Sequence, residues 1–157
     1  HPFPPLYDAD SKILILGSLP SVKSREQMFF YGHPQNRFWK VISAVLQEET
    51  PTTIEEKRKM LLAHHVALWD TIYSCDIIGS SDSSIKNVVP TDLRTVVEQS
   101  KIQHIYCNGR TSGKYFEKYQ QKTLGMTAEV LPSTSPANAA FGLEKLIAIW
   151  SEALQAY

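Results

Sequence analysis

The chain has 157 residues, a length that fits one domain around a single hydrophobic core. Its formal net charge is +0, which counts against a protein that coats nucleic acid non-specifically, because such binding rests on phosphate neutralisation. A local basic face on a neutral enzyme remains compatible with this charge.

Two cysteines, Cys75 and Cys107, are too few for a four-thiolate cluster or a cysteine-rich zinc site. We expect both to be reduced and buried. No apolar run approaches the ~20 residues that cross a bilayer, and no signal-peptide pattern opens the sequence. These features predict an intracellular, cytoplasmic protein with no membrane segment.

The first half of the chain alternates between strand and helix patterns. Residues 12–17 form a short apolar run that predicts a buried strand. Residues 53–56 match a capping box that opens a helix, and the apolar run 66–69 predicts a second strand. Between the first strand and the capping box, one helix face carries apolar side chains at i, i+3, i+4 and i+7 spacing, namely Phe38, Val41, Ile42, Val45 and Leu46.

The second half repeats this alternation. Residues 90–91 predict the start of a helix. The third strand is expected at 102–107, followed by a helix over 110–121. The fourth strand is expected at 128–131, before a last helix at 143–150. Strands alternating with helices predict an α/β domain with a mostly parallel sheet and helices on both faces.

Ligands of such sheets bind beyond the carboxyl ends of the strands. The segments that follow the four predicted strands are small, polar and turn-forming, so we expect them to meet at one edge of the sheet. These segments are residues 17–21, 70–71, 108–110 and 132–136.

Common catalytic motifs are missing from the sequence. It contains neither a P-loop nor G-x-G-x-x-G, and neither HExxH nor the zinc deaminase signature. It also lacks the G-x-S-x-G elbow, which leaves a Ser-His-Asp hydrolase as a remote option. His64 and His65 are adjacent at a predicted helix end and point apart, so they make a poor pair of metal ligands.

Two segments carry candidate functional side chains, each with a purely structural alternative. Asn36 either caps the helix that follows it or holds a water, a sugar or a base. Tyr31 either stacks on a flat heterocycle or packs in the core, and the residues alone favour the core. The hydroxyls and amides of residues 131–141 either bind a phosphate or close a capped loop.

Taken in order, these segments resemble the uracil-DNA glycosylase superfamily, and most closely the hypoxanthine-DNA (deoxyinosine) glycosylase family. The HPxNRFW piece is also similar to the mismatch-specific uracil glycosylases. The matching pieces span most of the chain: ILILGSLPS (13–21), YGHPQNRFW (31–39), ALWDTI (67–72), SC (74–75), GSSDSSI (79–85), NG (108–109) and LPSTSPANA (131–139).

This resemblance implies a single domain over residues 1–157, folded as a three-layer αβα sandwich with a central four-stranded parallel sheet. It implies that a nucleotide is flipped from DNA into a pocket. Ser18 stands where uracil glycosylases carry Asp or Asn, so the family likeness assigns catalysis to Asn36 and base stacking to Tyr31. The implied base pocket comprises Gly17, Ser18, Leu19, Tyr31 and Asn108.

The second family motif grips DNA. Ala137 stands nearest the usual leucine wedge, so duplex insertion is either weak or supplied by Asn138. A basic rim could come from Lys23, Arg25, Arg37 and Lys114, although scattered solvated charges are the simpler interpretation. The implied DNA-binding residues are Ser133, Ser135, Pro136, Ala137 and Asn138.

The resemblance predicts a monofunctional, monomeric DNA glycosylase that excises a deaminated base in base excision repair, with DNA containing that base as its partner and no metal or cofactor. Hypoxanthine ranks first, with uracil and xanthine behind it. No lysine lies in the matched motifs, so a lyase step through a Schiff base is not expected. The alternatives are a mismatch-specific uracil or thymine glycosylase and, from another class, a non-catalytic nucleotide- or DNA-binding module. In a prokaryote we expect association with the nucleoid.

Overall fold

A computed structural model of the chain describes residues 1–77 and 82–154. Its centre is a four-stranded sheet in the order β2-β1-β5-β6, in which every neighbouring pair is parallel. The strands are β1 (Ile13–Gly17), β2 (Val66–Asp70), β5 (His104–Asn108) and β6 (Ala128–Leu131). The predicted parallel sheet is therefore confirmed, with strand ends close to those expected.

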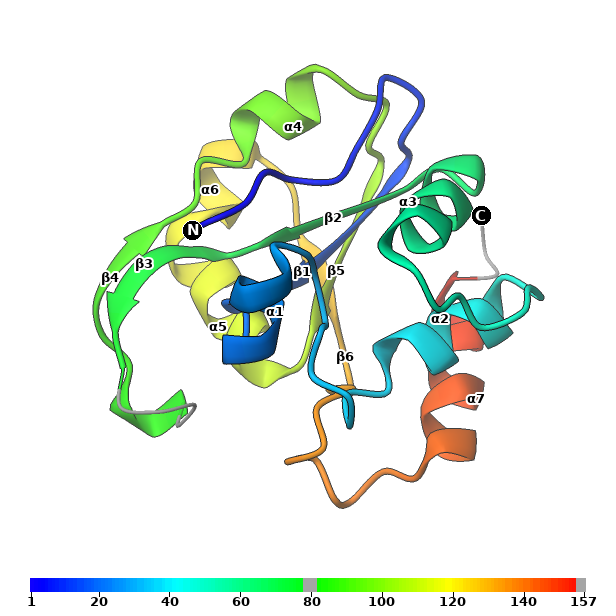
Figure 1. The fold of residues 1–157 in the computed structure, drawn as a ribbon. Helices are drawn as coiled ribbons and strands as arrows, with labels where there is room; N and C mark the ends of the chain where they lie inside the picture. The colour runs from blue at the N-terminus through cyan, green and yellow to red at the C-terminus, as the bar shows by residue number, and fades with distance from the viewer. Residues whose placement is uncertain (78–81, 155–157) are drawn as a thin grey trace.

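Helices cover both faces of this sheet and complete the expected three layers (Figure 1). α2, α3 and α7 lie on one side, and α5 and α6 lie on the other. The helices are α1 (Val22–Gln27), α2 (Phe38–Val45), α3 (Ile54–Ala63), α4 (Arg94–Glu98), α5 (Arg110–Tyr119), α6 (Gln121–Leu124) and α7 (Leu143–Leu154).

The core forms where α2 and α7 pack over the sheet. All five residues of β1 are buried, as expected for a central parallel strand with helices on both faces. The rings of Phe38 and Trp150, both fully buried, meet edge to face at 6.0 Å. Trp150 Nε1 donates a hydrogen bond to the Pro132 carbonyl (3.0 Å), so the last helix also anchors the loop after β6.

A second, smaller sheet was not predicted. β3 (Ile72–Asp76) and β4 (Lys86–Pro90) pair antiparallel and project from the main body (Figure 1). Most of their residues are exposed or half-buried, so the apolar alternation that reveals a strand is weak. Cys75 lies on β3 and is half-buried, whereas Cys107 is buried as expected. Both thiols are free.

The prediction that a helix opens at Pro90 is wrong. Pro90 is the last residue of β4, and the Thr91 N–H extends the pairing by donating to the Thr71 carbonyl (3.0 Å). α4 begins only at Arg94. Pro90 therefore ends an edge strand, a position that proline tolerates because its missing N–H costs no ladder bond there.

Other helix signals hold. Thr53 Oγ1 accepts a hydrogen bond from the Glu56 N–H (3.1 Å), as the capping pattern predicts. The helix expected over 110–121 is divided at Gln120 into α5 and α6.

Among the described residues, no helix has both the length and the apolar character to cross a membrane.

Candidate active site

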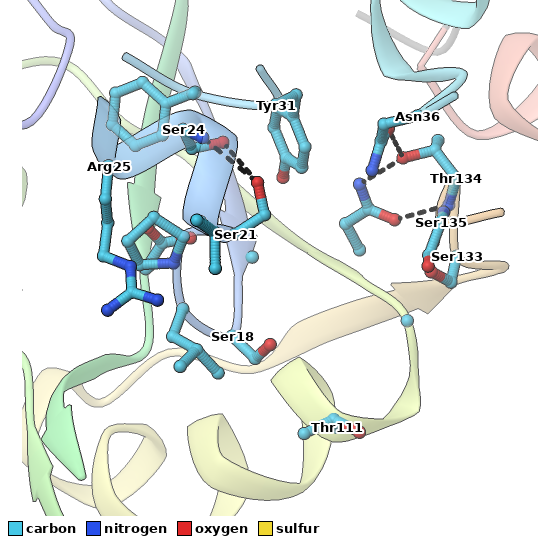
Figure 2. Close-up of a pocket in the computed structure, with 18 of the residues that line it drawn as sticks. Ser18, Ser21, Ser24, Arg25, Tyr31, Asn36, Thr111, Ser133, Thr134 and Ser135 are labelled. Carbon is cyan, nitrogen blue, oxygen red and sulfur yellow. Dashed lines mark hydrogen bonds between the residues drawn. The ribbon is translucent and has the colours of Figure 1, made fainter. Parts of the chain in front are cut away.

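A cleft of about 250 Å³ opens at the carboxyl edge of the sheet (Figure 2). Loops that follow β1, β5 and β6 contribute to its wall, together with Asp70, the last residue of β2, so the predicted meeting of strand ends at one edge is confirmed. This volume lies just below the roughly 300–1,000 Å³ that is typical of pockets for drug-sized molecules. Eight predicted site residues line it, namely Gly17, Ser18, Leu19, Tyr31, Asn36, Asn108, Ser133 and Ser135.

Asn36 lines the cleft and lies one residue before Arg37, which is the N-cap of α2, so the prediction that Asn36 itself caps this helix is only partly correct. Its Oδ1 accepts hydrogen bonds from the Phe38 N–H (2.9 Å) and from the Thr134 hydroxyl (2.8 Å). A backbone N–H can only donate, so the oxygen must face Phe38 and the amide cannot be flipped. Within the described residues Nδ2 has no acceptor, and this N–H donor is the group that Asn36 can offer to a ligand in the cleft.

Thr134, which the sequence did not single out, connects the two candidate amides. Its side chain is fully buried. Its Oγ1 accepts from Asn108 Nδ2 (3.0 Å) while donating to Asn36. Asn108 Oδ1 in turn accepts the Thr134 N–H (3.0 Å). The amide of Asn108 is thus engaged at both ends, and Asn108 serves mainly to hold this wall of the cleft together.

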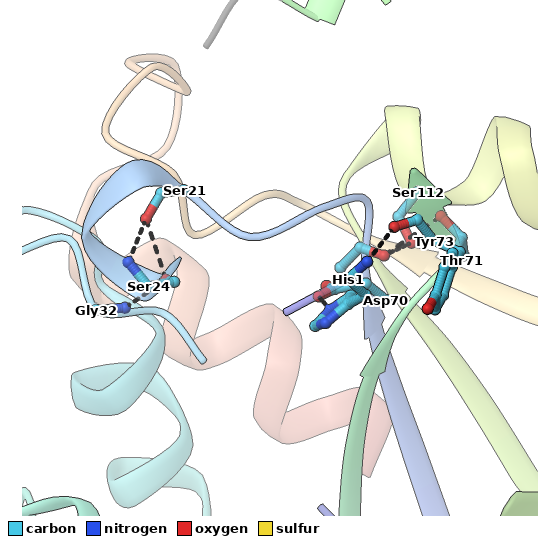
Figure 3. A network of polar contacts seen from close by, with 9 residues as sticks. His1, Ser21, Ser24, Gly32, Asp70, Thr71, Tyr73 and Ser112 are labelled. Atoms are coloured by element: carbon cyan, nitrogen blue, oxygen red, sulfur yellow. Dashed lines mark hydrogen bonds and ion pairs between the residues drawn. The ribbon is translucent and has the colours of Figure 1, made fainter. Parts of the chain in front are cut away.

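Tyr31 stands in the cleft with one ring face already covered. Its ring stacks on Phe38 at 4.0 Å, and Figure 2 shows its hydroxyl directed into the cleft. That buried hydroxyl has no hydrogen-bond partner among the described residues. The neighbouring backbone is fixed by Ser24, whose Oγ accepts the Gly32 N–H (2.8 Å; Figure 3). Tyr31 therefore combines the core contact and the cleft position that the sequence left as alternatives.

Asp70 is a site residue that sequence reasoning missed. It ends β2, lines the cleft and is almost fully buried. Burial raises the pKa of its carboxyl to about 7. Oδ2 lies 2.6 Å from His1 Nε2 (Figure 3). Burial, followed by the charge of Asp70, also raises the pKa of the Tyr31 phenol.

Gly17 allows Asp70 and Tyr31 to approach the turn after β1. A Cβ at Gly17 would lie 2.5 Å from Asp70 Oδ1 and 3.2 Å from the Tyr31 hydroxyl oxygen, too close for any larger residue without rearrangement. A hydrogen bond from α5 also holds the end of β1 in place, because the Ser112 hydroxyl donates to the Leu16 carbonyl (2.7 Å).

The turn after β1 also supplies candidate backbone donors. The Ser18 carbonyl accepts the Ile72 N–H (2.9 Å). Among the described residues, the N–H groups of Ser18 and Leu19 have no hydrogen-bond acceptor. They are therefore available to a ligand in the cleft, as predicted for a glycine-containing turn at the end of a strand.

The loop after β6 is folded by its own serines. Ser133 Oγ accepts the Ser135 N–H (3.1 Å), and Ser135 Oγ accepts the Ala137 N–H (3.2 Å). Asn138 Nδ2 donates back to the Ser133 carbonyl (3.0 Å), which occupies the side chain considered as a duplex wedge. Pro136 and Ala137 are exposed at the tip and, with Asn138, stand outside the lining of the cleft.

The four cations considered as a basic rim have different roles. Arg25 lines the cleft. Lys23 pairs with Glu26 (3.3 Å), and Lys114 lies over the ring of Tyr115 (5.4 Å). Arg37 is directed at backbone carbonyls of the loop after β6.

Residues 79–81 of the matched GSSDSSI piece lie outside the described residues. Within the described residues, no cluster of three side chains that could bind a metal occurs.

Comparison with known proteins places this chain in a family. A family model described as the uracil DNA glycosylase superfamily matches residues 4–154. A Methanosarcina acetivorans protein named hypoxanthine DNA glycosylase is 36% identical over 141 residues, covering 88% of each chain. A Methanosarcina barkeri protein of the same name is 29% identical over 155 residues, covering 98% of this chain and 96% of the relative.

A solved structure agrees with the fold. The solution NMR structure of a Methanosarcina acetivorans protein, described as a candidate uracil DNA glycosylase, matches with a TM-score of 0.80 and 33% identity. The match covers 96% of this chain and 95% of that protein. Because both the family model and these relatives span nearly the whole chain, this protein belongs to the uracil DNA glycosylase superfamily.

Proposed function

We propose that this DNA glycosylase excises a deaminated base, with hypoxanthine first, from DNA by hydrolysis of the N-glycosidic bond. The observation that carries the proposal is the amide of Asn36, whose oxygen is fixed by Phe38 and Thr134 and whose Nδ2 is left to the cleft. Two relatives named hypoxanthine DNA glycosylase support the choice of base. Uracil is the second candidate, because the related solved structure is described as a candidate uracil glycosylase.

The chemistry follows from which donors the cleft can offer. As the C1′–N bond of the flipped nucleotide breaks, the base leaves with the electron pair and the sugar gains oxocarbenium character. The N–H groups of Ser18 and Leu19, which lack acceptors among the described residues, are donors suited to the charge that builds on the base. Water then adds to C1′ and loses a proton to solvent, and the departing base takes up a proton from solvent.

Asn36 acts in this scheme as a hydrogen-bond donor. Both acceptor positions of its oxygen are already used, so it positions the sugar or the attacking water through Nδ2. It does not take a proton from that water. A dissociative transition state tolerates this, because the oxocarbenium ion is electrophilic enough to react with neutral water. No lysine is among the described residues that line the cleft, which supports a monofunctional enzyme without a Schiff base.

A substrate panel tests the proposal directly. Labelled duplexes carrying one hypoxanthine, xanthine, uracil or mismatched thymine are incubated with the protein and then cleaved with alkali at abasic sites. We expect strand breaks at hypoxanthine, and weaker or no cleavage at the other bases. Cleavage only at mismatched uracil or thymine would favour the mismatch-specific alternative. Binding without cleavage on every duplex would identify a non-catalytic module.

Two substitutions at Asn36 separate the role of its oxygen, which accepts two hydrogen bonds, from the role of its Nδ2 donor. Asn36→Asp keeps an acceptor for Phe38 and Thr134 but removes the Nδ2 donor, whereas Asn36→Ala removes both. We expect both variants to lose single-turnover excision while still binding DNA. Only Asn36→Ala should lose stability, by about 1 kcal/mol, the usual net contribution of a hydrogen bond. An Asn36→Asp enzyme with the wild-type excision rate would show that the amide donor is unnecessary.

Tyr31 is expected to stack on the flipped base with the ring face that Phe38 leaves uncovered. Tyr31→Ala should weaken binding to a duplex with a non-hydrolysable deoxyinosine analogue by about 1–3 kcal/mol, the usual value for one stacked base. Tyr31→Phe keeps the ring and should retain that affinity. An abasic duplex offers no base to stack on, so it should bind wild type and Tyr31→Ala equally. Equal weakening on both duplexes would refute stacking.

The raised pKa of Asp70 predicts a pH dependence of stability. The native carboxyl, with a pKa of about 7, keeps a proton that the unfolded chain releases near the ordinary aspartate pKa of 3.8. The folded state therefore holds more protons between roughly pH 4 and 7, and the free energy of unfolding falls as pH rises through this window, by at most about 1.4 kcal/mol per unit.

Urea denaturation at several pH values measures this slope. The side chain of Asp70→Asn cannot titrate, so the variant should lack the part of the pH dependence that comes from Asp70. Its free energy of unfolding should therefore rise relative to that of wild type as pH rises. Asp92→Asn, at an exposed position, serves as the control and should not show this gain. If the stabilities of wild type and Asp70→Asn differ by a constant amount from pH 4 to 7, Asp70 does not titrate as inferred.

A further inference from the structure

We propose that Arg37 is a positioning residue. It holds the loop of residues 132–141, which is assigned to DNA binding, at a fixed position relative to the catalytic amide of Asn36. The inference rests on the proposed function, because it assigns the loop to DNA and the amide to the reaction. Arg37 does so through backbone carbonyls of the loop, without contacting a phosphate.

The contacts of Arg37 converge on one loop. Nη2 donates to the carbonyls of Ser135 (2.8 Å) and Asn138 (3.1 Å), and Nη1 donates to that of Phe141. Nε adds a longer bond to the Thr134 carbonyl (3.4 Å). One side chain thus binds four carbonyls between residues 134 and 141. Only the planar five-donor fork of a guanidinium can bind so many acceptors in different directions.

Thr134 is the point where this loop meets the catalytic amide. Its carbonyl also accepts the Arg37 backbone N–H (3.0 Å), and its hydroxyl donates to Asn36 Oδ1 (2.8 Å). Asn36 and Arg37 are adjacent in sequence, and both form hydrogen bonds with the same loop. A shift of the loop would therefore displace the amide of Asn36 as well.

The charge of Arg37 has no acidic partner in the part of the chain that the structure describes. None of the ion pairs within residues 1–77 and 82–154 includes Arg37, and its positive charge is met by carbonyl dipoles. The residue is only partly accessible, with its nitrogens committed to the loop. Four of its five N–H donors are used by the loop, which is why we assign Arg37 to positioning.

Salt dependence distinguishes positioning from a phosphate contact. Arg37→Met keeps the length and apolar stem of the side chain and removes its donors. On an abasic duplex, which reports DNA binding independently of base choice, we expect affinity to fall about 10- to 100-fold. The slope of log K against log[salt] should stay unchanged. A slope reduced by about 0.9, the value for one phosphate neutralised, would overturn the proposal, as would wild-type affinity.

Controls address charge and folding. Arg94→Met removes one exposed positive charge, from a side chain paired with Asp92, and should bind as wild type does. Arg37→Lys keeps the charge but not the fork, so we expect it to remain weak. If Arg37→Met does not fold, Arg37→Gln, which keeps two amide donors, is measured in its place and should bind weakly with the wild-type salt slope. A fully active Arg37→Lys variant would contradict the inference.

The excision assay separates this inference from the proposed function. If wild type excises hypoxanthine and Arg37→Met also binds the abasic duplex weakly, both hold. If wild type cleaves no deaminated base but Arg37→Met still loses affinity at constant salt slope, the proposed function fails and the positioning role stands. If wild type cleaves while Arg37→Met binds normally, only the positioning role fails.

Discussion

The geometry of the cleft depends on one buried hydroxyl, that of Thr134. A hydroxyl has a single proton, and Thr134 donates it to Asn36 Oδ1, while Thr134 Oγ1 accepts a hydrogen bond from Asn108 Nδ2. This order fixes the direction of both amides without any charged group. A valine at position 134 would fill similar space but leave the half-buried amides of Asn36 and Asn108 each with one hydrogen bond fewer, which is costly where water is partly excluded.

The parallel sheet makes this arrangement possible. Asn108 ends β5 and Thr134 follows β6, and these neighbouring strands pair in parallel, so their carboxyl ends meet. Gly109 allows the chains to come this close, since its φ is +95° and a Cβ there would lie 3.0 Å from Ser133 Cβ. Asn36 reaches the same edge from the start of α2, which α7 and Trp150 hold against the sheet.

The sequence predicted the elements that carry a strong apolar period and the edge where polar loops meet. It placed Asn36 and Tyr31 at that edge only through family resemblance, because an isolated asparagine or tyrosine has no periodic signal. Asp70, Thr134 and the contacts of Arg37 escaped prediction, since each depends on partners 69 to 104 residues away in the chain. The β3–β4 pair escaped because its exposed residues show little alternation.

The cleft retains several groups that would be unfavourable if it served only the fold. The carboxyl of Asp70 is buried with His1 as its side-chain partner, the Tyr31 hydroxyl has no partner among the described residues, and the backbone of Tyr31 takes a positive φ of 52°. Buried polar groups are normally hydrogen-bonded, and positive φ is costly for a bulky residue. The Tyr31 hydroxyl and the Asp70 carboxyl both lie close to Gly17, where the proposed mechanism puts the flipped base. A set of capped turns that served only the fold would have no need of these groups.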